Sequence, residues 1–427
     1  MIVQGINVFS ISISRLAQTD NTNTGSFLQT PFWSEFKAAH GWNYSRFSIR
    51  QTFREDEAEK PHSCGKNVSA GQNAETEKTG EFSVLTRSFS HGLFSIAYIP
   101  LFPQLPFECT PEETIEDALD SDGTTVIEKP LVTAETQTIE FAHLVKEIAA
   151  ALKPYLPKNT ICIRFDPAVS FGTPEERDAF NYGLKVVSFA DRLHLRKNSV
   201  DIQPPDSTLV DLTPDTEEIL ERMKSKWRYN IRLSERKGVQ IEKVTGADPL
   251  FSEKLDVFYD LYKITSERDG IAIHAKSYYE DLLKKSSDEL AQKKDVPAVT
   301  LYLAKHEDDY LGAIITLFSR TESVYLYGCS SNVKRNLMPN FLLQWTAMQD
   351  AKKYGSLYYD MYGMPPTDDE NHPMHGLYLF KTGFGGKNIH RIGTFDVPVH
   401  ILYRACIAAE SMRAFWHKKI MKKIRGR

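Results

Sequence analysis

The fold is constrained most by a succession of strand and helix patterns in the second half of the chain. Three apolar segments rich in β-branched and aromatic residues, 298–304, 311–318 and 323–329, follow one another across short connections. A segment with helical periodicity at 339–354 then leads to another apolar strand at 357–362. Short connections favour antiparallel pairs, whereas a helical crossover favours a parallel pair. We therefore expect an α/β or α+β fold with mixed sheets.

The length of the chain indicates two domains. With 427 residues it exceeds what one core usually supports. The second unit begins near Thr208 and ends with one predicted strand at 389–397. In the first unit, 54–80 is polar and aperiodic, which predicts a mobile hairpin loop. The segment 108–138 holds nine acids and one lysine, which predicts a solvated linker; an acidic lure for a basic partner is the alternative.

One lysine lies among aromatic residues and glycines in the segment 374–386, which reads MHGLYLFKTGFGG. Lys381 follows Phe380 directly and precedes Phe384 by three residues. A buried strand that breaks into a Gly/Pro turn at 357–366 comes just before this segment. In such surroundings the dielectric is low, and the charge of a lysine acts strongly on a nearby reacting group. The alternative is a surface lysine on a short amphipathic helix.

Asp360 lies in that strand between bulky residues. A carboxylate in such a position has to be paired or have a raised pKa. It can therefore act as a general base, or it can brace Lys381 or Tyr362, and we favour bracing. Either role makes Asp360 a candidate residue of the catalytic site.

The segment 214–237 predicts one long helix with two stripes. Its apolar stripe contains Leu220, Met223, Trp227 and Ile231, and a cationic stripe beside it contains Lys224, Arg228, Arg232 and Arg236. Like charges one turn apart repel each other, and Glu235 is the one acid among them. The cationic stripe therefore indicates binding of phosphate or carboxylate, for which arginine forks are suited. A solvated face, or ion pairs to the other domain, is the alternative.

The end of the chain is also basic. The segment 411–427 carries seven Lys or Arg residues and no acid, with apolar residues interleaved. Such a helix can rest on anionic lipid or on an RNA backbone, and a packed terminal helix with a solvated tail is the alternative. The N-terminal segment lacks the pattern of an export signal, and no run of about 18 apolar residues occurs. We expect a cytoplasmic protein with peripheral contact to the inner face of the membrane.

The sequence lacks the usual motifs for metals and cofactors. Its five cysteines are scattered, odd in number and without a CxxC pair, which predicts reduced thiols rather than a disulfide framework or a zinc ribbon. His372 and His375 are close in sequence, but no third ligand follows nearby. P-loop, GxGxxG, GxSxG and HExxH motifs do not occur. We expect no metal site and no cofactor.

An ordered set of motifs runs through nearly the whole chain. It begins with FLQTPFWSEFKAAHGW at 27–42 and continues with IRFDP, the IQP at 202–204 and MKSKWRYNIRLSERKGV. It ends with PNFLLQWTAMQDAKKYG, LYYDMYG and LYLFKTGFGG. This set resembles the Fem family of aminoacyl-tRNA-dependent transferases, which build the interpeptide bridges of peptidoglycan.

The resemblance implies two tandem GNAT-like domains, the first formed by 1–207 together with 398–427 and the second by 208–397. It implies transfer of an amino acid from aminoacyl-tRNA, a co-substrate, to the peptide amine of a precursor, either UDP-MurNAc-pentapeptide or lipid II. Phe380 and Lys381 match the pair at the family's reaction centre, where the lysine steadies charge.

The resemblance also implies the residues that bind the precursor. Lys37, Arg228 and Arg232 match positions that hold its phosphates and carboxylates, and Tyr278 matches an aromatic residue at that site. We assign contact with tRNA to the basic C-terminal helix. Three departures from the family pattern stand out: LFPQLP at 101–106 replaces a Gly-Pro turn, 54–80 and 108–138 look like insertions, and a long coiled-coil arm is absent.

Two other functions remain open. An acyl-CoA N-acetyltransferase on the same fold would hold pyrophosphate with a Gly-rich turn at a helix N-terminus. The corresponding stretch, 330–345, contains no glycine, which counts against acetyl-CoA. A non-catalytic binding protein of envelope synthesis would need the basic elements but not Lys381.

Overall fold

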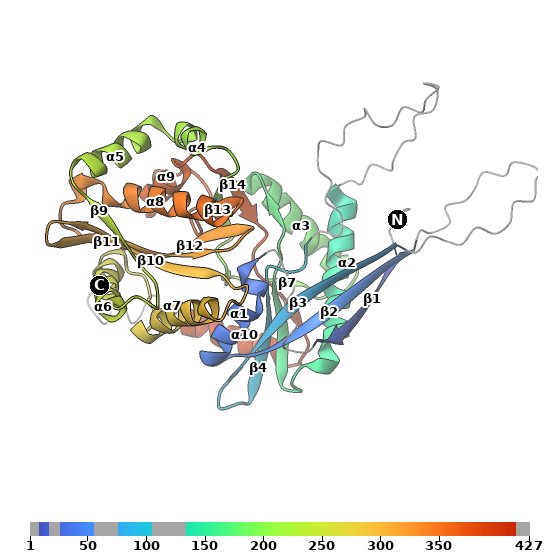
Figure 1. Cartoon of the computed structure of the whole chain (residues 1–427). Helices are drawn as coiled ribbons and strands as arrows, with labels where there is room; N and C mark the ends of the chain where they lie inside the picture. The colour runs from blue at the N-terminus through green and yellow to red at the C-terminus, as the bar shows by residue number, and fades with distance from the viewer. Residues whose placement is uncertain (1–7, 17–25, 55–75, 105–133, 416–427) are drawn as a thin grey trace, which may run out of the picture.

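The computed structural model describes residues 8–16, 26–54, 76–104 and 134–415. In this part of the chain two sheets lie side by side, with helices around and between them (Figure 1). Both sheets are mixed, because each contains antiparallel pairs and a parallel pair. The prediction of an α/β chain with mixed sheets is therefore confirmed.

The first sheet contains β1 (Val8–Arg15), β2 (Asn43–Arg54), β3 (Thr76–Phe89), β4 (Phe94–Pro100), β5 (Thr160–Asp166), β15 (Phe395–Pro398) and β7 (Arg196–Lys197), in this spatial order. The strands β1 to β4 pair antiparallel in succession, and β4 pairs parallel with β5. All seven residues of β5 are buried, as the apolar pattern of this strand predicts.

The second sheet contains β6 (Ser170–Phe171), β14 (Lys387–Arg391), β8 (Asp206–Asp211), β13 (Tyr358–Asp360), β12 (Glu322–Ser330), β11 (Asp309–Phe318), β10 (Ala298–His306) and β9 (Gln240–Val244), in this spatial order. The predicted hairpins are present as β10–β11 and β11–β12. The predicted helical crossover is also present, since β12 and β13 are parallel.

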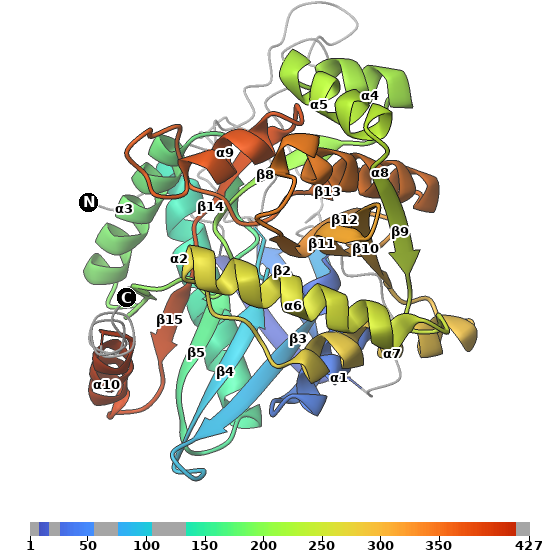
Figure 2. The ribbon, with the colours of Figure 1, turned by 90° about the vertical axis from the view of Figure 1, so that its left-hand side faces the viewer.

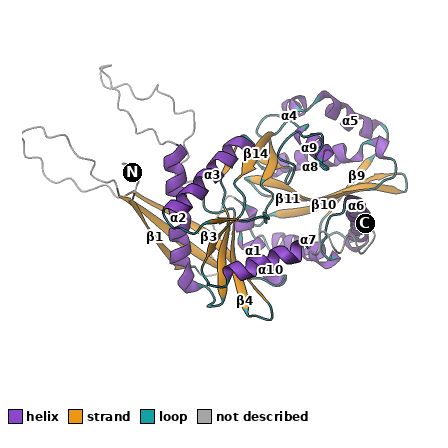
Figure 3. Cartoon of the chain, turned by 180° about the vertical axis from the view of Figure 1, so that it is seen from behind, coloured by secondary structure: helices purple, strands orange, loops and turns teal. Residues whose placement is uncertain are grey.

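Among the described helices, α2 (Ala134–Leu152), α3 (Pro174–Ala190) and α10 (Tyr403–Phe415) accompany the first sheet. Apolar residues of α2 and α3 share a core with β2 to β5. Thr173 begins α3 with a reciprocal capping box to Glu176, which satisfies orphan amides of the first turn. Seen from behind, α10 lies below α3 (Figure 3).

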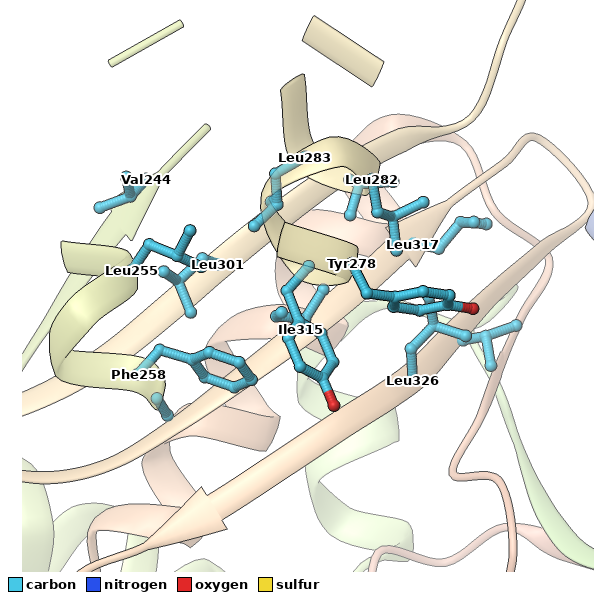
Figure 4. Packing of buried hydrophobic residues seen from close by; sticks show 14 of the residues in the cluster. Val244, Leu255, Phe258, Tyr278, Leu282, Leu283, Leu301, Ile315, Leu317 and Leu326 are labelled. Atoms are coloured by element: carbon cyan, nitrogen blue, oxygen red, sulfur yellow. The ribbon is translucent and has the colours of Figure 1, made fainter. Parts of the chain in front are cut away.

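The second sheet has helices on both faces. The helices are α4 (Thr216–Arg222), α5 (Ser225–Arg236), α6 (Phe251–Asp269), α7 (Lys276–Ala291), α8 (Pro339–Tyr354) and α9 (His375–Thr382). Alternate residues of β10 enter different cores: Leu301 and Leu303 pack with α6 and α7, whereas Tyr302 and Ala304 pack with α4, α5 and α8. This alternation follows from the two-residue period of a strand. Figure 4 shows part of the core under α6 and α7, including Tyr278.

The helix α1 (Pro31–Ala39) connects the two halves of the molecule. As predicted, Thr30 is its N-cap, with its side chain accepting from the Trp33 amide, and Pro31 is its first residue. Phe32, Trp33 and Phe36 of this helix pack into the core of the second sheet, against α7. The N-terminal part of the chain is thereby fixed to the C-terminal part.

Two predicted elements are wrong. The long helix at 214–237 is broken at Met223 and Lys224 into α4 and α5, because Met223 has an extended backbone and the Lys224 amide donates to the Gly383 carbonyl instead. The strand at 389–397 is two strands in different sheets, β14 and β15, with Gly393 in a left-handed conformation between them. The division into domains stays a prediction.

Several other predictions fall partly or wholly outside the described residues. These are the loop at 54–80, the linker at 108–138 and the basic segment at 411–427. Where the loop and the linker are described they are wrong, because residue 54 ends β2, residues 76–80 belong to β3 and residues 134–138 begin α2. Residues 411–415 lie in α10. Of the five cysteines, Cys162, Cys329 and Cys406 are described; the first two are buried and Cys406 is half-buried. Among the helices that the structure describes, none is both long enough and apolar enough to cross a membrane.

Candidate active site

The helix α9 carries the predicted pair Phe380 and Lys381 on a wall of aromatic rings. Phe380 packs edge-on against Phe341 of α8 and against Phe384, with ring centroids 5.2 and 5.3 Å apart. The indole of Trp227 on α5 donates to the Phe380 carbonyl at 2.9 Å. The ring of Trp227 fills the space beside Gly383, where a Cβ would lie 2.3 Å from the indole. Glycine is therefore required here for α5 to dock on α9.

Lys381 points away from solvent, with 5% of the residue's surface exposed. Its Nζ donates to the carbonyls of Met361, Tyr362 and Gly363 at 2.6, 3.0 and 2.8 Å. Tyr362 adopts φ +60°, a left-handed conformation, and this turn after β13 lets the three carbonyls converge. An ammonium has three N–H donors, so each of them has an acceptor in this loop.

The surroundings of Lys381 weaken its charge. Burial lowers its pKa from 10.5 to about 7, and the nearby Asp360 carboxylate opposes this shift. Its Nζ also lies 5.0 Å from the ring centroid of Tyr325. The three carbonyl dipoles favour the protonated form, because they bond to the ammonium. The alternative of an exposed lysine on an amphipathic helix is excluded by this burial.

Asp360 ends β13 and supports the same loop from the other side. Its Oδ1 accepts from the Tyr362 amide at 2.7 Å and from the Ser207 hydroxyl, and its Oδ2 accepts from Arg391 at 3.2 Å. Burial, together with the charge of Asp360, raises the pKa of neighbouring Glu322 to about 8. These bonds correspond to the bracing role, and they brace Tyr362 rather than Lys381 itself.

Lys37 and Tyr278, predicted to bind the precursor, lie together between α1 and α7. The Nζ of Lys37 is 5.9, 5.9 and 5.5 Å from the ring centroids of Trp33, Trp42 and Tyr278. Arg87 of β3 lies over Trp42 at 5.5 Å. Burial lowers the pKa of Lys37, and the charge of Arg87 lowers it further. We call these five residues the Lys37 cluster.

The Lys37 cluster is adjoined by two histidines. His274 stacks on Tyr278 with centroids 4.0 Å apart, and His40 lies 4.7 Å from the same ring. Burial and the charges of Lys37 and His40 lower the pKa of His274. In the described chain neither Lys37 nor Arg87 forms an ion pair with an acid. Cations without a counter-charge in an aromatic setting are suited to a phosphate or carboxylate ligand.

A ring contact followed by hydrogen bonds links the Lys37 cluster with the loop around Lys381. Tyr98 lies 6.2 Å from Trp42 and donates to Asp166 at 2.6 Å. Gln203 donates to Tyr98 at 3.0 Å and accepts from the hydroxyl of Tyr362 at 2.5 Å. The two candidate centres therefore share one polar seam between the sheets.

Sequence reasoning misses this seam. In the sequence Gln203 stands out only as part of the IQP motif, and Tyr98 and Asp166 only as strand residues. The one available signal is the polar residue inside each of these apolar motifs, since a buried polar group needs a partner. The identity of that partner depends on the tertiary fold.

Arg228 and Arg232 lie on α5. Arg228 donates to the carbonyls of Glu221 and Met223 at 2.9 and 2.5 Å, so it caps the C-terminus of α4. Arg232 is exposed. In the described chain we find no contact that joins either arginine to Lys37 or Tyr278. Their role in binding the precursor stays a prediction.

The histidines near α9 are engaged with neighbouring groups. His375 lies 2.5 Å from Asp368, and His372 accepts from the Met374 amide at 3.1 Å. Within the described residues no three His, Cys, Asp or Glu side chains are grouped so as to hold a metal ion.

Comparisons with known proteins support the motif analysis. A family model described as the FemAB family matches residues 137–292 and 285–411. The lipid II:glycine glycyltransferase of Staphylococcus aureus is 28% identical over 313 residues, which cover 59% of this chain and 70% of that protein. The crystal structure of FemX aligns with a TM-score of 0.61 and 19% identity, covering 93% of this chain and 100% of that one. This structural similarity shows a shared fold.

Proposed function

The chain belongs to the FemAB family and is an aminoacyltransferase, and we propose that it transfers an amino acid from aminoacyl-tRNA to the peptide amine of a peptidoglycan precursor. The family membership confirms the resemblance that the motifs indicate. The relative from Staphylococcus aureus is named for its action on lipid II, which favours a lipid-linked acceptor at the cytoplasmic face of the membrane. UDP-MurNAc-pentapeptide is the soluble alternative.

The single observation that carries this proposal is the buried Lys381 in an aromatic-walled site, joined by the polar seam to the Lys37 cluster. In the reaction the amine nitrogen of the acceptor attacks the ester carbon of aminoacyl-tRNA. A C–N bond forms, the C–O bond to the terminal ribose breaks, the amine loses a proton and the ribose oxygen gains one. The tetrahedral intermediate carries an oxyanion.

Lys381 supplies the positive charge near this oxyanion. Its three N–H donors already bond to carbonyls. It therefore stabilises the oxyanion through its electrostatic field, or through one N–H that leaves its carbonyl in the loop 361–363 and donates to the oxyanion. Asp360 positions that loop through Tyr362. Phe380 forms part of the wall that excludes water. The Lys37 cluster, including Tyr278, holds the phosphates of the acceptor, with Arg228 and Arg232 as further predicted ligands.

An acyl-CoA transferase is disfavoured by the start of α8. This helix begins with Pro339, which has no amide hydrogen, so one of the donors that a pyrophosphate would need is missing. Just before it, Lys334 is engaged by Glu307 and Asp309 at 2.6 and 2.8 Å. These features do not form the open amide cradle of a phosphate site.

The test is a transfer assay with radiolabelled charged tRNA and labelled acetyl-CoA in parallel, offered UDP-MurNAc-pentapeptide or lipid II in detergent. We expect label to move from tRNA to the peptide. Label moving only from acetyl-CoA would return the chain to the acetyltransferases. Binding of the precursor without transfer from either donor would indicate a non-catalytic binding protein.

The role of Lys381 is tested in the same assay. Lys381→Ala should lower turnover on the order of a hundredfold, because one stabiliser of an oxyanion typically contributes this much. Binding of the precursor, measured by calorimetry, should stay within error of the wild type, since the Lys37 cluster is intact. Full turnover by this variant would remove Lys381 from the mechanism.

A further inference from the structure

The outer face of α5 presents exposed cations, and the catalytic proposal uses only Arg232 among them, as a predicted ligand of the precursor. Lys226, Arg232 and Arg236 lie on the helix, and Lys224 and Lys237 flank it. All five side chains are exposed. In the described part of the chain we find an ion pair for none of these five. Glu235 is the one acid within 224–237. The whole chain carries a net charge of −4, so this concentration of positive charge is local.

The helical period places a polar stripe and one aromatic residue on this face. Ser225, Tyr229, Arg232 and Arg236 recur every three or four residues and are all exposed. Tyr229 has 57% of its surface exposed, although tyrosine usually covers part of its ring. On the opposite side of the helix, Asn230, Ile231 and Ser234 are buried.

This face adjoins the candidate reaction centre. The Trp227 indole donates to the Phe380 carbonyl, and the Lys224 amide donates to the Gly383 carbonyl at 2.9 Å. The first turn of α5 is thus hydrogen-bonded to the helix that carries Lys381. In Figures 1 and 2, α4 and α5 form the outer edge of the molecule beside α8 and α9. A long polyanion could lie along α5 with its end at α9.

We propose that the outer face of α5 binds the acceptor arm of the RNA donor, with Arg232, Arg236 and the flanking lysines on its phosphates and Tyr229 stacked on a base. The inference rests on the proposed function, because that function supplies an RNA co-substrate. It assigns RNA contact to α5, in addition to the basic C-terminal segment, and gives Arg232 an RNA role instead of a precursor role.

Charge and chemistry favour RNA over the other anions at hand. Cations that contact phosphates release counterions, and exposed aromatic rings stack on unpaired bases. A membrane-binding helix needs an apolar face as well as cations, but Tyr229 is the one large apolar residue strongly exposed on α5. The precursor phosphates are fewer, and the Lys37 cluster provides for them on a different element.

The test measures binding of an uncharged RNA hairpin that reproduces a tRNA acceptor arm, at a series of salt concentrations. The double variant Arg232→Ala/Arg236→Ala removes two cations from α5. We expect the slope of log K against log salt to fall in magnitude by about two, roughly one for each phosphate that no longer has a cation beside it. Tyr229→Ala should weaken binding roughly tenfold and leave the slope unchanged, because stacking involves no counterion.

The matched control is the double variant Lys185→Ala/Arg192→Ala, which removes two exposed cations near the C-terminal part of α3, away from α5. This variant should keep the wild-type slope, because its effect is limited to net charge. An equal change of slope in both double variants would overturn the proposal in favour of a general charge effect. An unchanged slope in the α5 variant would also overturn it.

The transfer assay separates this inference from the proposed function. If the proposed function holds and Arg232 contacts RNA instead of the precursor, Arg232→Ala/Arg236→Ala should raise KM for charged tRNA and leave KM for the precursor unchanged. If the wild type transfers from tRNA but the double variant changes only the KM for the precursor, the proposed function stands and the RNA surface is rejected. If the double variant binds RNA like the wild type but no longer binds vesicles that contain anionic lipid, α5 is a membrane-binding surface and the proposal is rejected.

Discussion

A buried lysine that bonds only to backbone carbonyls has no fixed negative partner. Lys381 is in this position, because its three acceptors are the carbonyls of residues 361–363 and Asp360 bonds elsewhere. Its charge is therefore costly to keep in the fold, yet is not neutralised by a direct ion pair. A charge held in this way can respond to a developing oxyanion.

The pKa of Lys381 makes stability depend on pH. Its folded-state pKa is about 7 and its ordinary value is 10.5. Between these values the unfolded chain binds the proton and the folded chain does not, so the contribution of Lys381 to stability improves as pH rises from about 7. Methionine carries no charge to bury, so we expect Lys381→Met to have a higher free energy of unfolding than the wild type near pH 7.5. This difference, measured by urea unfolding, should shrink by roughly 2 kcal/mol between about pH 7.5 and 9.5.

The exposed Lys185 provides the control for this measurement. Lys185→Met should show the same difference from the wild type at both pH values, because the exposed side chain of Lys185 is in contact with water in the folded and in the unfolded chain. If Lys381→Met also shows a constant difference, then the three carbonyls hold Lys381 protonated through this range and burial is not the dominant influence.

For single residues, the sequence predicts the sheltered environment of Lys381 but not its hydrogen-bond acceptors. Aromatic residues and glycines around Lys381 indicate a sheltered lysine, and the structure buries it. The convergence of three carbonyls depends on the left-handed conformation of Tyr362. Tyrosine does not prefer that conformation, so nothing local in the sequence indicates it.

Among the elements, the contact between α5 and α9 determines where the reaction centre meets the basic helix. Periodicity predicts one helix over 214–237, because the apolar stripe continues through Met223. The structure breaks this helix, since the Lys224 amide bonds to Gly383 and Arg228 caps the end of α4. The bond to Gly383 joins residues more than a hundred positions apart, so local periodicity could not reveal it.

Gly383 and Gly376 provide a matched test of this contact, because both belong to the α9 segment. A Cβ at Gly383 would lie 2.3 Å from the Trp227 ring, whereas a Cβ at Gly376 meets nothing within 4 Å. Gly383→Ala should therefore lower the free energy of unfolding by about 1–3 kcal/mol through overpacking. Gly376→Ala should be neutral or stabilise by up to about 1 kcal/mol, because alanine favours a helix over glycine.

Urea unfolding, followed by tryptophan fluorescence, measures both variants. The emission of Gly383→Ala should also change in the folded state, because the Trp227 indole has to move. Equal stability of the two variants would show that α5 yields without cost and that Trp227 does not fix α9.

At the scale of the whole molecule, the candidate site is assembled from segments that are distant in sequence. The Lys37 cluster comes from α1, β3 and α7, and the Lys381 loop follows β13. The chain also crosses between the sheets at Gly393, and the buried Arg164 binds Asp396 of the returning strand at 2.7 and 3.0 Å. The motifs predict the family and its fold class. They do not predict that the segment 389–397 divides into β14 and β15 in different sheets, because this division depends on the tertiary structure.

Gln203 tests whether the two centres depend on each other. Tyr98 donates its hydrogen to Asp166, so its oxygen has to accept from the Gln203 amide nitrogen, and the amide oxygen then faces the hydroxyl of Tyr362. Gln203→Met removes both bonds and takes away the acceptor of the half-buried Tyr362 hydroxyl, which should cost about 2 kcal/mol of stability. Because Tyr362 supplies a carbonyl to Lys381, turnover should fall roughly tenfold while KM for the precursor stays near the wild-type value.

Gln203→Glu separates this positioning role from simple packing, because glutamate has the same shape. Its second oxygen would face the Tyr98 oxygen, whose proton is committed to Asp166, so two acceptors would oppose each other. Protonation of the new carboxyl removes the conflict, and the loss of turnover should therefore diminish as pH falls. Gln292→Glu, an exposed change at the end of α7, should show no such recovery. A pH-independent loss in Gln203→Glu would mean that Gln203 contributes packing and does not position Tyr362 through its hydrogen bonds.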